Sequence, residues 1–215
     1  MFSNLFLVFF TFLVIGILCN FFLFTQEKKE KKSTKFITSE RLIVFVIEIM
    51  IAVIGFGVTL HITNDYEKQV DKEKAIQMLE QTIEYTGKEI ETESAYLDMY
   101  KNGNIETQIF LNSSVININY YNTILSNELI LQNANMNTFG YCMDYLVRIE
   151  DTDSRAKTAT DDPVVHSEMF WRCQYLKKLR DLLSVCSEEL SGNLSPEEAL
   201  IKCKAIDDQD IRTYP

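Results

Sequence analysis

Long runs of apolar residues occupy two stretches near the start of the chain, before any regular amphipathic pattern begins. The first, residues 2–24, reads FSNLFLVFFTFLVIGILCNFFLF and contains no ionisable side chain. The second, residues 42–62, reads LIVFVIEIMIAVIGFGVTLHI and contains a single acid, Glu48. Because a helix rises about 1.5 Å per residue, each run is long enough to cross a bilayer core about 30 Å thick. We predict that residues 1–62 form a transmembrane hairpin of two helices.

Each of these two runs has an alternative interpretation. The first could be the apolar part of a cleavable signal peptide, but no basic side chain precedes it and no small-residue cleavage site follows it. The second could be a helix buried in a soluble core, but two such runs so close together are not typical of a soluble domain. We therefore favour a retained anchor and a second span.

Amphipathic helical spacing begins after the second run. Over residues 64–101, apolar side chains recur at intervals of three, four or seven, namely at Ile76, Leu79, Ile83, Ile90, Leu97 and Tyr100. Thr86 and Glu93 occupy alternate positions and interrupt this stripe. We predict one long helix, continuous with the second span and packed in a bundle; a dimeric coiled coil is the alternative. The turn signal Asn102-Gly103-Asn104 is expected to end it.

The middle of the chain is less regular. Residues 105–131 favour a helix by length and apolar spacing, although residues 114–121 (SVININYY) alternate like a strand. After them we predict a loop over residues 132–138 and a helix over residues 139–149. The acidic sequence EDTDSRAKTATDDP, residues 150–163, is typical of a mobile connector.

Two helices are predicted at the C-terminal end. The first covers residues 164–190 and is capped by Gly192; its core residues are expected to be Val165, Met169, Cys173, Leu176, Leu179, Leu183 and Leu190. The second begins at Ser195-Pro196-Glu197-Glu198, which combines an oxygen cap, a first-turn proline and acids near the positive end of the helix dipole. This last helix is expected to end near Ala205.

Composition supports an all-α fold. Only 7 Gly and 3 Pro occur in 215 residues, which disfavours a loop-rich β-sandwich or a Gly-rich nucleotide-binding fold. From residue 61 onward there are 15 Lys and Arg against 27 Asp and Glu, a net charge of −12. This charge disfavours nucleic acid as a partner and should hold the domain away from anionic lipid headgroups. We predict that residues 63–215 form a soluble acidic bundle of about five helices.

The charge pattern also predicts an orientation. Six basic residues lie between the two apolar runs, within or near the predicted loop 25–41: Lys28, Lys29, Lys31, Lys32, Lys35 and Arg41. Basic residues in short loops are retained on the cytoplasmic side of the membrane. Both termini are therefore expected outside the cytoplasm, in the inner (plasma) membrane. A solvated linker without topological meaning is the alternative interpretation of these charges.

Glu48 is the one ionisable acid within either apolar run. It lies about 10 Å from the cytoplasmic edge of its span, at a depth similar to that of Asn20 in the first run. We predict a hydrogen bond between Asn20 and Glu48 that holds the hairpin together. A proton or ion path and a contact with another membrane subunit are the alternatives.

The second apolar run is similar to the anchor of a known group of proteins. Residues Glu48-Ile49-Met50-Ile51-Ala52-Val53-Ile54-Gly55 and Leu60-His61-Ile62-Thr63-Asn64 resemble the pattern E-I-x-L-x-V-I-G-x-x-I-x-L-Q-I-N-N-W. That pattern belongs to uncharacterised bacterial membrane-anchored proteins of a domain-of-unknown-function family. His61 replaces the usual Gln, Asp65 and Tyr66 stand near the expected Trp, and the first run has no counterpart. The resemblance implies a bacterial inner-membrane protein with its soluble part in the periplasm, and implies no activity.

Four of the five cysteines lie in the predicted soluble part, where an oxidising compartment permits disulfides: Cys142, Cys173, Cys186 and Cys203. Cys173 and Cys186 are too far apart along one helix to bridge. The pairing Cys186–Cys203 with Cys142–Cys173 is one hypothesis, and four buried free thiols are the other.

The sequence contains no recognisable catalytic constellation. There is no CxxC pair, P-loop, GxSxG elbow or dinucleotide fingerprint, and the two histidines, His61 and His166, have no ligand spacing. We therefore expect no catalytic residue, metal or cofactor. The expected function is a non-enzymatic membrane-anchored protein that binds itself or another membrane protein through its extracytoplasmic helices. The alternative is a membrane effector or small pore-forming oligomer of a bacterial toxin or phage-defence system, with the helices as sensor.

Overall fold

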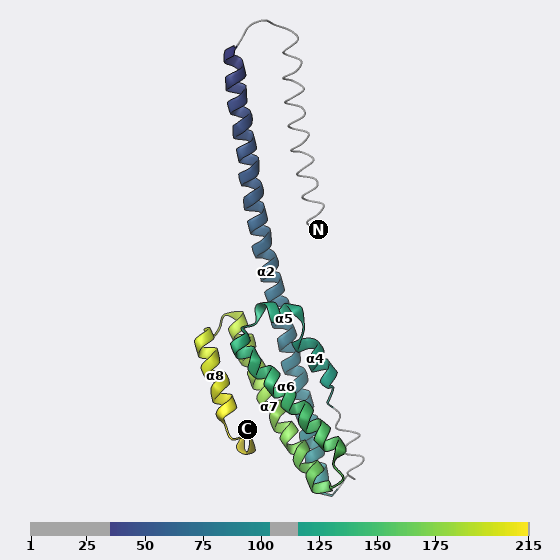
Figure 1. Cartoon of the computed structure of the whole chain (residues 1–215). Helices are drawn as coiled ribbons and strands as arrows, with labels where there is room; N and C mark the ends of the chain where they lie inside the picture. The colour runs from purple at the N-terminus through teal and green to yellow at the C-terminus, as the bar shows by residue number, and fades with distance from the viewer. Residues whose placement is uncertain (1–34, 104–115, 215) are drawn as a thin grey trace. The chain divides into compact units, whose positions relative to one another are not determined.

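The computed structural model describes the backbone of residues 35–103 and 116–214, with side chains from residue 47 onward (Figure 1). Within these residues the chain forms six α-helices and one 3₁₀ helix, so the fold is all-α. The chain divides into two units, Met1–Tyr66 and Glu67–Pro215. The predicted first span, with Cys19 and Asn20, lies outside the described residues.

The longest helix, α2, covers Lys35–Lys101, a total of 67 residues. It begins seven residues earlier than predicted, so that Lys35 and Arg41 are helical rather than part of a loop. From Ile47 onward it is long and apolar enough to cross a membrane, and none of its most apolar window is buried. Side chains such as Ile51 and Ile62 are more than 60% exposed. This stretch could therefore be a membrane span.

The part of α2 in the second unit presents one face to the bundle core. Leu79, Ile90 and Leu97 are buried as predicted, and the other apolar positions of the stripe are half-buried against them. Thr86 and Glu93 do not interrupt this face, because both are fully buried in it. The Thr86 hydroxyl donates to the carbonyl of Thr82 and accepts from the phenol of Tyr121 at 3.2 Å. These bonds satisfy a polar group that would otherwise be costly to bury.

Residues 105–115 of the helix predicted over residues 105–131 lie outside the described residues, and the remainder contains two short helices in place of one. They are α4, Ile118–Leu125, and α5, Glu128–Asn133. Each begins at an asparagine whose side chain accepts a backbone N–H, Asn117 from Tyr120 and Asn127 from Leu129. Asparagine is a preferred N-cap, so each of these two side chains favours the start of a helix at its position. Over residues 116–121, the described part of the strand-like segment, no strand forms, because α4 already begins at Ile118.

Helix α6 covers Met136–Thr158 and includes most of the segment predicted as a mobile connector. That prediction was wrong, because three residues of the segment are buried on the core face of α6: Thr152, Asp153 and Ala156. The predicted loop over residues 132–138 is also shorter in the structure, since only Ala134 and Asn135 separate α5 from α6. The acidic composition of this segment comes mainly from the exposed face of α6. The buried face of the helix continues through the segment, and composition alone does not show this.

The last two helices confirm their predicted starts and caps. Helix α7, Asp162–Ser191, ends at Gly192, whose φ of 85° is readily adopted only by glycine. Helix α8, Pro196–Asp208, begins with a capping box in which Ser195 and Glu198 exchange hydrogen bonds with each other's backbone. It ends three residues later than predicted, and a 3₁₀ turn, η1, follows at Ile211–Thr213.

Helices α6 and α7 form an antiparallel hairpin at the centre of the second unit, and α8 packs against both (Figure 1). Their shared core is continuous with the buried face of α2. All seven residues predicted to form the core face of α7 are buried. This arrangement brings polar side chains from α2, α6 and α7 together inside the bundle.

Candidate functional site

The most distinctive chemical feature of the bundle is an ionic cluster of three buried residues, Glu93, Asp153 and Arg172, together with the exposed Lys157. Arg172 on α7 donates from Nη2 to both carboxylate oxygens of Glu93 on α2, at 2.7 and 2.9 Å. Its Nη1 donates to the carboxylate of Asp153 on α6. Lys157, one turn further along α6, donates to the other oxygen of Asp153 at 2.6 Å. The cluster thus joins three helices through charge-assisted hydrogen bonds.

Burial governs the electrostatics of this cluster. Glu93, Asp153 and Arg172 are between 1% and 5% exposed, so little water reaches their charged groups. Loss of hydration raises the pKa of the Glu93 carboxyl to about 7, although the neighbouring Arg172 guanidinium acts to lower it. Two further acids, Glu89 and Asp153, raise the pKa of Glu93 slightly. The Glu93 carboxyl therefore titrates near neutral pH.

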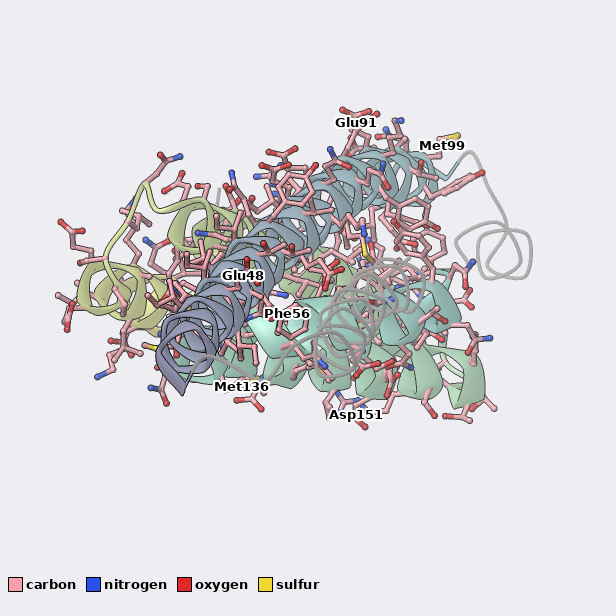
Figure 2. All side chains as sticks on the ribbon, turned by 90° about the horizontal axis from the view of Figure 1, so that it is seen from above. Glu48, Phe56, Glu91, Met99, Met136 and Asp151 are labelled. Atoms are coloured by element: carbon pink, nitrogen blue, oxygen red, sulfur yellow. The ribbon has the colours of Figure 1, made fainter. Side chains whose placement is uncertain are left out.

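The neighbouring acids are arranged differently. Glu91 on α2 and Asp151 on α6 are exposed and point away from the bundle (Figure 2). Asp151 pairs with Arg155 at 2.8 Å on the surface of α6. The two acids that face Arg172, Glu93 and Asp153, are those that lie on the otherwise apolar face of their helices. The cluster is therefore suited to fixing the register of three helices.

The sequence itself contains a signal for this cluster. Each of the three core charges stands where its helix is otherwise apolar: Glu93 between Ile90 and Leu97, Asp153 between Ile149 and Ala156, Arg172 between Met169 and Leu176. Two acids and one base in such positions suggest mutual pairing, because isolated buried charges are very costly.

A second buried cation, Lys178 on α7, holds the C-terminal segment. Its ammonium donates to the backbone carbonyls of Asp207 at 3.0 Å and Gln209 at 2.6 Å. It also lies over the ring of Tyr214 at 5.2 Å. Carbonyls at the end of a helix lack partners within the helix, so Lys178 caps the C-terminus of α8. The Tyr145 phenol reinforces this contact by donating to the Asp207 carboxylate at 2.8 Å.

The four described cysteines are all buried free thiols. The Sγ atoms of Cys142 and Cys186 lie 3.7 Å apart. Cys173 instead lies 3.5 Å from the hydroxyl of Ser94 on α2. The structure therefore does not bring Cys142 and Cys173 together as hypothesised, because Cys173 is on the face of α7 that meets α2. Cys203 lies close enough to Cys186 to interact with it electrostatically.

The predicted membrane contact is only half within the described residues. Glu48 is exposed on α2, whereas its expected partner Asn20 lies outside them (Figure 2). The hydrogen bond between these two residues therefore stays a prediction.

The two histidines take part in local contacts. The ring of His166 stacks on that of Tyr100 at 5.1 Å, and His61 lies 3.5 Å from Asp65 one turn later on α2. Among the described residues, no three His, Cys, Asp or Glu side chains are grouped so as to hold a metal ion.

Comparison with known proteins gives no relative for this chain. No family model, no curated protein and no solved structure matches it. The resemblance at the second apolar run thus stays a prediction.

Proposed function

We propose that this chain is a non-enzymatic membrane protein whose acidic helical bundle binds another copy of itself or another membrane protein outside the cytoplasm. The observation that carries the proposal is the composition of α2. One part of this helix is a bare apolar stretch of membrane-spanning length, and another part supplies a face of the bundle core. A single helix thus belongs both to an anchor and to a folded domain.

The side of the membrane follows from charge. The basic residues near the start of α2 favour the cytoplasm, and the net charge of −12 from residue 61 onward does not oppose export. The lipid bilayer is therefore one partner. We place the chain in the inner (plasma) membrane with two spans and both termini extracytoplasmic.

The interior of the bundle supports a binding role rather than a catalytic one. The buried charges of α2, α6 and α7 are directed at each other, and Lys178 is directed at backbone carbonyls of its own chain. Groups used in this way stabilise one arrangement of helices. The outer surface, in contrast, offers isolated apolar side chains on two different helices, such as Val147 at 62% and Ile201 at 67% exposure.

Association can be measured on the full chain in its membrane. A photoreactive amino acid is placed at Val147, at Ile201 and at the exposed Met136, and cells are illuminated before extraction. A discrete adduct of twice the chain's mass indicates self-association, and another discrete mass indicates a different membrane protein. Light scattering on the detergent-solubilised chain then gives the number of copies.

The proposal fails if no position yields a discrete adduct and light scattering finds one chain per micelle. Membrane permeabilisation on expression of the chain, with the bundle in the cytoplasm, would instead favour an effector or small pore whose bundle acts as the sensor. The two functions are thus separated by topology as well as by association.

A further inference from the structure

Three cysteines from three helices meet in the core of the bundle. Cys142 on α6, Cys186 on α7 and Cys203 on α8 are each 3% exposed or less. The sulfurs of Cys142 and Cys186 are in van der Waals contact at 3.7 Å. Cys203 lies near both, since it interacts electrostatically with each of them.

We propose that Cys142 and Cys186 form a disulfide that links α6 to α7 in the mature protein. The inference rests on the extracytoplasmic location in the proposed function, because disulfides persist in oxidising compartments. A disulfide bond is about 2.05 Å long, so the two sulfurs must approach by roughly 1.7 Å. The two cysteines lie on helices that already pack together, so the proposed bond requires rotation of their side chains and an adjustment between α6 and α7.

The contacts of the other cysteines make this pair the preferred one. Cys173 is directed at Ser94 of α2 and is therefore separated from Cys142. Cys203 is the internal competitor for Cys186, but only the sulfur of Cys142 contacts that of Cys186 at hydrogen-bonding distance. The proposed link across the central hairpin thus differs from the hypothesised pairing Cys186–Cys203.

The oxidation requires an acceptor for two electrons, which we take to be a small-molecule or protein disulfide. One cysteine thiolate attacks a sulfur of that acceptor, forms a mixed disulfide and releases one thiol. The second cysteine, after losing its proton, attacks its partner's sulfur in the mixed disulfide and releases the second thiol. Two protons leave the cysteines, and the acceptor is reduced to two thiols.

The timing follows from burial. Loss of hydration raises the pKa of the Cys142 thiol, so that the reactive thiolate is disfavoured once the bundle has closed. The link therefore forms while the chain folds or when the hairpin opens, and it is shielded afterwards.

The four soluble cysteines can be assigned individually by trypsin digestion. Cleavage after Lys101, Arg148, Arg172, Lys177, Arg180, Lys202 and Lys204 places them in separate peptides, namely 102–148, 173–177, 181–202 and 203–204. The purified full chain in detergent is equilibrated with reduced and oxidised glutathione at several ratios, starting from both the reduced and the oxidised chain until they converge. It is then quenched in acid, alkylated in denaturant and digested without reduction.

The expected product joins peptide 102–148 to peptide 181–202, while Cys173 and Cys203 are alkylated. A link between peptides 181–202 and 203–204, or alkylation of Cys142 and Cys186 at the most oxidising ratio, would overturn the proposal. Because this test uses purified protein, its result does not depend on the compartment in which the bundle lies. An error in the proposed membrane orientation is therefore detected by a separate experiment.

Matched variants sharpen the assignment. Cys203→Ala and Cys173→Ala should retain the link, and Cys186→Ala should abolish it. Oxidation should raise the melting temperature of the wild-type chain by roughly 5–10 °C, because the link closes a long loop of the unfolded chain. The Cys186→Ala variant should show no such shift, and loss of the link in Cys203→Ala would contradict the pairing.

Discussion

Three charged residues occupy buried positions where the neighbouring side chains on the same helix face are apolar: Glu93, Asp153 and Arg172. Removing such groups from water costs several kcal/mol for each ion. The shared guanidinium of Arg172 offsets much of this cost by hydrogen bonding to both carboxylates. The stability of the bundle should therefore be sensitive to the loss of the Arg172 guanidinium.

Replacement of Arg172 by Met should be among the most damaging single changes in the bundle. It leaves two buried carboxylates without their shared cation, and the expected loss is about 3–5 kcal/mol in the free energy of unfolding. The surface control Arg155→Met removes exposed ion pairs and should change stability by about 0.5 kcal/mol or less. Thermal unfolding of the full chain, followed by circular dichroism, measures both. Equal effects of the two variants would show that the cluster does not stabilise the fold.

Glu93 should make stability depend on pH near neutrality. Its pKa is about 7 in the folded chain against a usual 4.5, so the folded state holds a proton that the unfolded state releases. The stabilisation from this group is thus present below about pH 4.5 and is lost as the pH rises through 7. The groups that face it, Arg172, Asp153 and Glu89, act on its pKa but do not reverse the sign.

The corresponding measurement compares melting temperatures at pH 5.5 and pH 8. The wild-type chain should lose more stability over this range than Glu93→Gln, in which the titrating group is absent. Glu91→Gln, an exposed change two residues away on the same helix, should behave like the wild type. If the pH dependence of Glu93→Gln equalled that of the wild type, the raised pKa would be disproved.

At the level of helices, the sequence predicted best those features that depend on neighbouring residues. The ends of α7 and α8 are determined by Gly192 and Ser195, whose effects act within one turn, and both predictions were confirmed. The interior of α6 was predicted poorly, because the burial of Asp153 depends on Arg172 of another helix. The starts of α4 and α5 were not predicted, because helical apolar spacing continues across the asparagine caps that begin these two helices.

Two glycines should respond to alanine in opposite directions. Gly192 has a φ of 85°, which a β-carbon disfavours, so Gly192→Ala should lower stability by about 1 kcal/mol. Gly140 lies within α6, and a β-carbon there would meet nothing within 4 Å, so Gly140→Ala should raise stability by about 0.5–1 kcal/mol. Urea midpoints of the two variants provide the comparison. Changes of the same sign would contradict the assigned backbone conformations.

For the whole molecule, composition and periodicity predicted an all-α chain with two apolar membrane spans and an acidic helical bundle; the first span lies outside the described residues. The structure confirms the helical class and the apolar stretch of α2. The set of side chains that meet inside the bundle could not be predicted, because contacts such as Glu93–Arg172 join positions 79 residues apart. Likewise, the pairing of cysteines depends on how α6, α7 and α8 pack together and not on the spacing of cysteines along the chain.

The central claim, that the bundle lies outside the cytoplasm, is tested most directly by thiol labelling of intact cells. The four native cysteines of the bundle are unsuitable for labelling because all of them are buried. The wild-type chain therefore serves as the unlabelled control. A cysteine is introduced at the exposed Ile201 of α8 and, in a second variant, at Lys31 in the basic segment. We expect a membrane-impermeant maleimide to label Ile201→Cys in intact cells and Lys31→Cys only after lysis. Labelling of Lys31→Cys in intact cells, with Ile201→Cys protected until lysis, would contradict the account.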